Sequence, residues 1–128
     1  KNAILYVIIT QLFALFSVLI FNYIQHVHAD EESDYNHSRN FVSPTTNFLL
    51  FNNGLHTIHH YRASIHWSET PEAHKKIDHL IAPHLKERGF WPYIIKAYII
   101  APFNNTFRTK SMRLERLAKQ QKSETSKV

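Results

Sequence analysis

Residues 3–24 read Ala-Ile-Leu-Tyr-Val-Ile-Ile-Thr-Gln-Leu-Phe-Ala-Leu-Phe-Ser-Val-Leu-Ile-Phe-Asn-Tyr-Ile, and this apolar stretch decides the fold. It contains no charge, and its strongly polar side chains are Thr10, Gln11, Ser17 and Asn22. As an α-helix it would be about 33 Å long, enough to cross the hydrocarbon core of a bilayer. It is too long for the apolar part of a signal peptide. We therefore expect a transmembrane helix over about residues 3–24; the alternative is a buried helix of a soluble domain.

Composition narrows the chemistry that the chain can perform. Its 128 residues include ten histidines, two glycines and no cysteine. The length allows one domain. The lack of cysteine excludes disulfides, thiolate metal sites and cysteine nucleophiles, and two glycines leave no room for a nucleotide-binding loop. Imidazole is therefore the abundant metal ligand. Because Lys1 leads directly into an apolar run, we expect this chain to be the C-terminal part of a longer protein or a processed product.

The segment His56-Thr-Ile-His59-His60 has the spacing of a metal-binding helix face. Positions i, i+3 and i+4 project from the same side of a helix, so all three imidazoles can point one way. Three neutral imidazoles suit neither a core nor a solvated surface, but they are good nitrogen ligands for iron or zinc. The alternative is a hydrogen-bonded cluster at a helix contact.

A second histidine group follows the apolar stretch. His26 and His28 are about 200° apart on a helix, so one helix cannot direct both at the same metal. Asn22 lies one turn before His26 and shares its face, which favours His26 as a ligand and Asn22 as the holder of a metal-bound water. His28 and the loop residue His37 are weaker candidates, either as metal ligands or as residues that contact a metal ligand. The alternative for each is an ordinary surface histidine.

The middle of the chain alternates polar loops with short helices. Residues 29–47 form an expected loop, whose acidic run (Asp30, Glu31, Glu32, Asp34) is either a solvated face or a source of iron ligands. A turn at 52–54 precedes the histidine helix. Thr70 and Pro71 begin a predicted helix over 71–88. Three histidines spaced by five share no face and are expected at the surface: His74, His79 and His84.

Two segments near the C-terminus bear on the membrane. Residues 91–103 combine Trp and Tyr with two prolines and are expected to lie at the membrane interface. Residues 108–128 carry seven Lys or Arg against two Glu, whereas residues 1–107 balance at eight of each sign. We expect this tail to be disordered and, with the histidine region, cytoplasmic. No aromatic residue follows Phe107, so we expect no nucleic-acid partner.

The two histidine segments together resemble the C-terminal half of the integral-membrane fatty acid desaturases. Asn22-Tyr-Ile-Gln-His-Val-His28 is similar to the end of a transmembrane helix in that family, and His56-Thr-Ile-His-His60 to its third histidine box. The resemblance covers roughly residues 21–74. It implies an all-α membrane fold in which this chain is a fragment of a larger helical bundle. It also implies metal ligation by His26, His56, His59 and His60, with Asn22 holding a metal-bound water.

The same resemblance implies the reaction. Two iron ions held by histidines activate O2 with two external electrons from a donor such as a ferredoxin or cytochrome, and remove hydrogen from an acyl chain of a membrane lipid. The family's two earlier histidine boxes do not occur here, so the chain alone is expected to be inactive. Phe48 and Phe51 are candidate channel walls, and the basic tail would contact an acidic electron carrier or anionic lipid. The alternatives are a related hydroxylase or ketolase, and a non-enzymatic membrane protein that binds metal through histidines.

Overall fold

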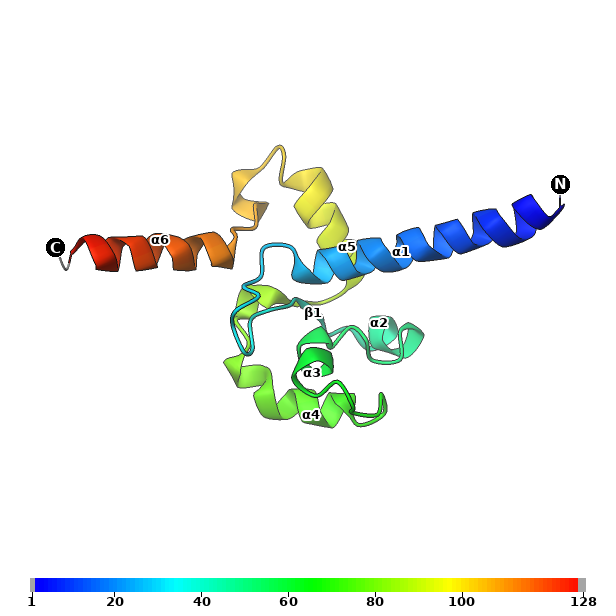
Figure 1. Cartoon of the computed structure of the whole chain (residues 1–128), viewed down its shortest axis with the longest axis horizontal. Helices are drawn as coiled ribbons and strands as arrows, with labels where there is room; N and C mark the ends of the chain where they lie inside the picture. Colours follow the sequence, from blue (N-terminus) through cyan, green and yellow to red (C-terminus); the bar gives the residue numbers. More distant parts are fainter. Residues whose placement is uncertain (1, 127–128) are drawn as a thin grey trace.

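One long apolar helix projects from a small helical domain (Figure 1). The structure, a computed structural model, describes residues 2–126. A π-helical stretch (Ile4–Ile8) continues into α1 (Ile9–His26), and together they form a 23-residue helix that contains an 18-residue window of mean hydropathy 2.5. No residue of that window is buried in the structure; the buried residues of the helix are Ile24 and Gln25, in its last turn. The chain therefore has a helix long and apolar enough to cross a membrane, and its exposure argues against the buried-helix alternative.

The remaining elements are short and mostly helical, which confirms the all-α prediction. Two two-residue strands, β1 and β2, pair in parallel, with Asn40 opposite Lys86 and Phe41 opposite Glu87. The elements that follow α1 are β1 (Asn40–Phe41), α2 (Pro44–Leu49), α3 (His56–Tyr61), α4 (Thr70–Ile77), 3-10 turns at Asp78–Leu80 and Pro83–Leu85, β2 (Lys86–Glu87), α5 (Phe90–Ile94), a π-helical stretch at Ile95–Ile100, a 3-10 turn at Asn105–Phe107 and α6 (Met112–Thr125).

Two apolar clusters hold the histidine-bearing elements in place. One lies between α3 and α4 and comprises Ala29, Leu55, Ile58, Ala73, Ile77, Ile81 and Leu85. The other joins the end of α1 to β1 and α5 through Ile24, Phe41 and Tyr93. Burial of apolar side chains is the main force that fixes these contacts. The clusters therefore set the position of α3 and of the last turn of α1.

A buried arginine, Arg39, binds the carbonyl groups at the end of α1. Its side chain is 1% exposed, and its Nη1 donates to the carbonyl oxygens of Ile24 at 2.7 Å and Val27 at 3.2 Å. Its guanidinium lies 4.2 Å from the centroid of the Tyr93 ring. The last carbonyls of a helix lack partners within the helix and carry partial negative charge, so a cation is favourable there.

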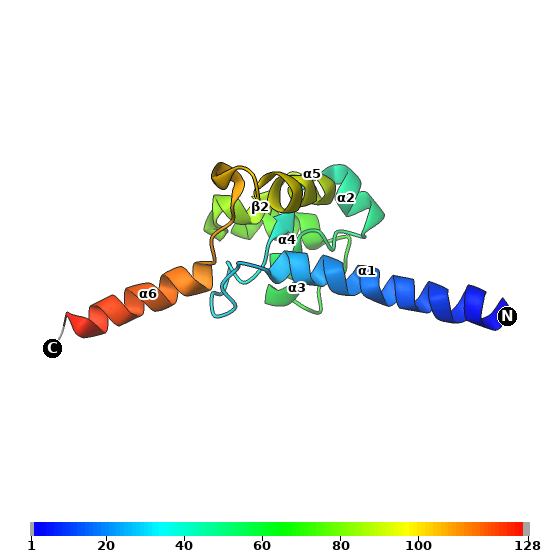
Figure 2. The same cartoon turned by 90° about the horizontal axis from the view of Figure 1, so that it is seen from above.

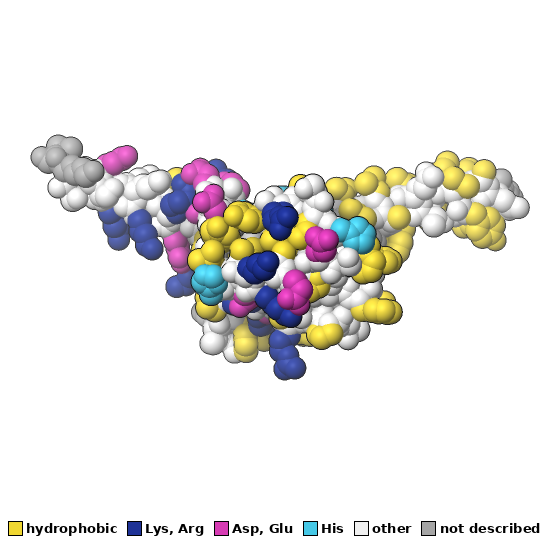
Figure 3. Space-filling view, turned by 90° about the horizontal axis from the view of Figure 1, so that it is seen from below, with side chains coloured by type: hydrophobic (Ala, Val, Ile, Leu, Met, Phe, Trp, Pro, Cys, Tyr) yellow, Lys and Arg dark blue, Asp and Glu magenta, His cyan; other side chains and the backbone are white. Residues whose placement is uncertain are grey.

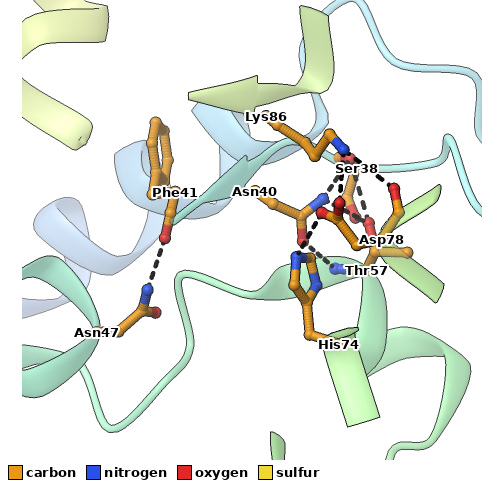
Figure 4. Close-up of polar contacts among 8 residues, drawn as sticks. All are labelled: Ser38, Asn40, Phe41, Asn47, Thr57, His74, Asp78 and Lys86. Atoms are coloured by element: carbon orange, nitrogen blue, oxygen red, sulfur yellow. Dashed lines mark hydrogen bonds and ion pairs between the residues drawn. The ribbon is translucent and has the colours of Figure 1, made fainter. Parts of the chain in front are cut away.

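The turn before α3 requires a glycine because the backbone passes close to its neighbours. A Cβ on Gly54 would lie 2.5 Å from Asn47 Oδ1 and 2.7 Å from the Phe41 carbonyl oxygen. Phe41 also donates its N–H to the Gly54 carbonyl at 2.8 Å. Asn47 in turn donates to the Phe41 carbonyl at 2.8 Å, as Figure 4 shows. The predicted turn is therefore present and fits tightly against β1.

The prediction of one helix over 71–88 is wrong beyond residue 77. α4 ends at Ile77, and the chain continues through two 3-10 turns into β2. Pro83 disfavours the helical conformation at Ala82, where ψ is 135°, so one continuous helix cannot reach residue 88; α4 itself ends before this proline. At the other end, Glu69 rather than Thr70 occupies the cap position.

The prediction that the C-terminal tail is disordered is also wrong within the described residues. Residues Met112–Thr125 form α6, which points away from the domain on the side opposite to the N-terminus (Figures 1 and 2). Arg116 pairs with Asp30 at 2.7 Å and Glu32 at 2.8 Å, and Arg113 pairs with Glu31 at 2.9 Å. The acidic run is therefore not simply solvated. Its pairing with α6 supplies stabilisation that the tail composition alone does not reveal.

The segment predicted to lie at the membrane interface is largely helical. Residues 90–100 form α5 and a π-helical stretch, with Tyr93 buried against the domain and Trp91 exposed. Its location at a membrane surface stays a prediction.

Candidate metal centre

Three histidines converge where the end of α1 meets α3. The Nε2 atoms of His26 and His56 are 3.1 Å apart, those of His56 and His60 are 3.1 Å apart, and those of His26 and His60 are 3.2 Å apart. These three residues form a group whose ligand atoms all lie within 4.8 Å of one another. The site thus joins two segments that are 30 residues apart in sequence.

Local structure explains the α3 half of the site. His56 and His60 are one turn apart, so their rings lie on one face of α3. The start of α3 is held by Asn40, whose Oδ1 accepts from the Thr57 N–H at 3.0 Å and whose Nδ2 donates to Thr57 Oγ1 at 2.8 Å (Figure 4). Ser38 Oγ lies 3.1 Å from the same hydroxyl. An N–H of the first turn of α3, which has no partner within the helix, therefore donates to a side chain from a distant segment.

The ring of His26 is oriented by a backbone group. Its Nδ1 lies 3.1 Å from the carbonyl oxygen of His37, which can only accept, so Nδ1 carries the proton. Nε2 is then unprotonated and directs its lone pair at the other two histidines. A carbonyl behind a histidine ligand fixes the tautomer in many metal sites. His37 thus contributes through its backbone, which no side-chain pattern could have revealed, while its ring lies 5.1 Å from that of His60.

Burial favours the neutral form of His56, His60 and His37. Burial lowers the pKa of His56 to about 3, with smaller contributions from the neighbouring His60 and His26. Burial also lowers the pKa of His60 and of His37. A neutral imidazole has a free lone pair, so His56 and His60 can bind a cation at neutral pH without first releasing protons.

The donor set fits a metal ion. Because each neutral ring has a single N–H and that of His26 is used by His37, the three Nε2 atoms cannot all donate to one another. Ligands about 2.1 Å from a metal lie about 3.0 Å apart on one octahedral face and about 3.4 Å apart in a tetrahedron. The spacings of 3.1–3.2 Å fall between these values, nearer the octahedral one.

The other candidates lie outside this group. His59 is exposed, and its ring stacks on that of His56 with centroids 5.6 Å apart. Asn22 is exposed on α1. His28 has a left-handed backbone, with φ 65°, and its Nδ1 contacts the Thr109 hydroxyl. The chain therefore turns away from the site immediately after His26.

His74 is not the surface residue that we expected. It is buried, and its Nε2 lies 3.4 Å from Asp78 Oδ1, while Asp78 Oδ2 pairs with Lys86 at 2.9 Å (Figure 4). Burial lowers its pKa, and the carboxylate of Asp78 acts in the opposite direction. The i, i+4 spacing to Asp78 was the available sequence signal. His79 and His84 are exposed, as predicted.

A polar hollow opens beside the three histidines. It measures about 500 Å³ and is lined by His26, Glu31, Glu32, Ser33, Asp34, His37, His60 and Tyr61. The acidic run therefore lies at the edge of the site, where its carboxylates add negative charge near a bound cation. Arg116 holds the first of them, Asp30, and its hydrogen bond keeps the pKa of that carboxyl below the usual value.

Comparison with known proteins gives one match. A family model described as fatty acid desaturase matches residues 2–107, which include α1, α3 and all three converging histidines. Neither the curated proteins nor the solved structures contain a significant match to the chain. The match ends where the basic tail begins and covers most of the sequence. The chain therefore belongs to the fatty acid desaturase family.

Proposed function

We propose that this chain forms part of the iron centre of a membrane acyl desaturase, which introduces a double bond into a lipid acyl chain with O2. The observation that carries the proposal is the convergence of three imidazole Nε2 atoms at the end of a helix able to cross a membrane. Neutral nitrogen ligands suit this chemistry because, unlike thiolates, they resist oxidation.

In this proposal His26, His56 and His60 hold one iron. His59, on the exposed side of α3, is assigned to the second iron, whose other ligands come from residues outside 2–126. Asn22, His28 and His37 are assigned supporting roles, His37 through its carbonyl. Because two iron ions need more ligands than these residues offer, we expect the chain alone to be inactive.

When bound, the iron pair supplies O2 activation and hydrogen removal, using two electrons from a ferredoxin or cytochrome. The protein's own contribution is to position the ligands and keep them unprotonated. Arg39 and Asn40 hold the two elements that carry the histidines. α1 places the site at the end of an apolar helix, where an acyl chain is within reach of a bound metal.

The orientation follows from the basic tail, which we propose lies on the cytoplasmic side with the histidine region. Arg113 and Arg116 are already paired with acidic residues of the loop. Among the described residues of the tail, the exposed lysines that can contact an acidic electron carrier or anionic lipid are Lys110, Lys119 and Lys122.

Metal titration tests the site directly. Co²⁺ added to the detergent-solubilised chain should give an absorption signal from nitrogen ligation. His26→Ala, His56→Ala and His60→Ala should each weaken binding by about 100-fold or more, since loss of a residue behind a ligand already costs about 10- to 100-fold. The matched control is the exposed His84→Ala. Equal affinity in all four variants would contradict the assignment.

Product analysis tests the reaction. A version extended by the upstream coding sequence, expressed in cells, should yield new unsaturated acyl chains by mass spectrometry, and His56→Ala in that background should abolish them. Hydroxylated or keto products would instead identify a related oxygenase. Metal binding without any oxidised product would favour a non-enzymatic metal-binding protein.

A further inference from the structure

An exposed apolar edge lies on α2, on the turn that follows α2 and on the loop between α3 and α4, away from the three histidines. Its members are Phe48 at 83% exposed, Leu49 at 67%, Phe51 at 65% and Trp67 at 50%. We call these four residues the aromatic edge. An isolated exposed apolar residue is ordinary, but a contiguous exposed group marks an interaction surface.

The aromatic edge is held together by specific contacts. The rings of Phe51 and Trp67 meet edge to face, with centroids 5.6 Å apart. Asn52 Nδ2 donates to the Trp67 carbonyl at 2.9 Å and ties the two loops to each other. Phe51 and Asn52 both have left-handed backbones, with φ 48° and 63°. This conformation is costly for a bulky residue such as phenylalanine, and residues held in it cluster at functional sites.

The position of the aromatic edge indicates what covers it. Figures 1 and 2 share the horizontal axis along which α1 runs, and in both α2 reaches back from α3 toward the N-terminal end of α1. The loop between α3 and α4 extends in the same direction in Figure 1. A bilayer crossed by α1 would therefore approach the domain from this side.

The surroundings show the polarity change expected at a bilayer surface. The edge borders a groove of about 950 Å³ whose lining also includes His74, Lys75, Asp78 and Lys86. Figure 3 shows charged side chains over the middle of the face seen from below and hydrophobic ones around them, including on the side from which α1 projects. Trp and other aromatic residues concentrate at the boundary between headgroups and acyl chains.

We propose that the aromatic edge inserts into the membrane interface beside α1 and sets the tilt of the domain against the bilayer. Phe48 and Phe51 are then lipid-contacting residues rather than walls of a substrate channel. The inference depends on α1 crossing the membrane and not on the desaturase reaction, so it can fail or succeed independently of the proposed function.

Fluorescence in vesicles tests the proposal, because the chain has only two tryptophans. Trp91→Phe leaves Trp67 as the reporter in chains reconstituted into phosphatidylcholine vesicles. Lipids brominated near the headgroup end of the acyl chain should quench Trp67 more than lipids brominated near the chain terminus. Acrylamide in the water phase should quench it weakly.

A matched pair of leucines separates membrane contact from general effects. Leu49 is 67% exposed on the edge and Leu114 is 65% exposed on α6. In the Trp91→Phe background, Leu49→Ser should reduce quenching by the headgroup-proximal bromines about twofold, whereas Leu114→Ser should leave it unchanged. Strong acrylamide quenching with no lipid quenching in inserted chains would overturn the proposal. Protection from both quenchers would also overturn it, because the edge would then be covered by protein.

Discussion

Replacement of Arg39 by methionine tests how the end of α1 is fixed. Methionine keeps an unbranched apolar chain against Tyr93 but removes the charge and both hydrogen bonds to the carbonyls of Ile24 and Val27. Because His26 is the last residue of α1, any loosening of this end displaces one of the three converging histidines.

The magnitude follows from opposing contributions. Hydrogen bonds from a charged donor contribute about 1.5–3 kcal/mol each, and a desolvated cation–π contact contributes about 2 kcal/mol. Against this, burial of the guanidinium costs several kcal/mol, a cost that methionine does not incur. Within residues 2–126 the buried Nε of Arg39 has no hydrogen-bond partner, which adds to that cost. We therefore expect a net loss of about 2–3 kcal/mol.

Thermal unfolding in detergent, followed by circular dichroism, measures this loss. A domain of this size shifts its Tm by about 4–8 °C per kcal/mol, so Arg39→Met should lower the Tm by about 10–20 °C. Arg39→Lys, which keeps the charge but not the planar guanidinium, should have a Tm between those of the parent chain and Arg39→Met. Arg88→Met, at an exposed position, is the control. A Tm within about 3 °C of the parent chain would refute the reasoning.

Three further predictions concern the support of α3. In the unfolded state His56 binds a proton below pH 6.5, whereas in the folded state it does so only near pH 3. The free energy of unfolding should therefore decrease as the pH falls from 6.5 toward 3. His56→Gln should weaken this pH dependence of stability, measured by unfolding at a series of acidic pH values. Gly54→Ala should lower stability by about 1–3 kcal/mol in urea unfolding, because its Cβ would lie 2.7 Å from a backbone oxygen. The control is Gly89→Ala, whose Cβ would lie 3.6 Å from its nearest neighbour and should be nearly neutral. Equal effects of the two substitutions would contradict the steric argument. Asn40→Ala should cost about 1–3 kcal/mol, because a buried N–H of α3 loses its acceptor; an unchanged urea midpoint would contradict this.

Some features follow from local sequence and could be predicted. The helix able to cross a membrane depends on 22 consecutive uncharged residues, and hydropathy alone indicates it. The shared face of His56 and His60 depends on helical periodicity, which neighbouring residues determine. Pro83 is a local signal against one continuous helix over 71–88, although α4 already ends at Ile77.

Other features depend on contacts between distant segments, and the sequence by itself did not determine them. α6 is helical rather than disordered, and its Arg116 pairs with Asp30, 86 residues earlier. His74 is buried because α4 packs its apolar face against α3. His26 is selected over His28 because the chain reverses after α1, and its tautomer depends on a backbone carbonyl of His37. Periodicity indicates which side chains share a face, but only tertiary packing decides which faces meet, because that outcome minimises free energy over the whole chain.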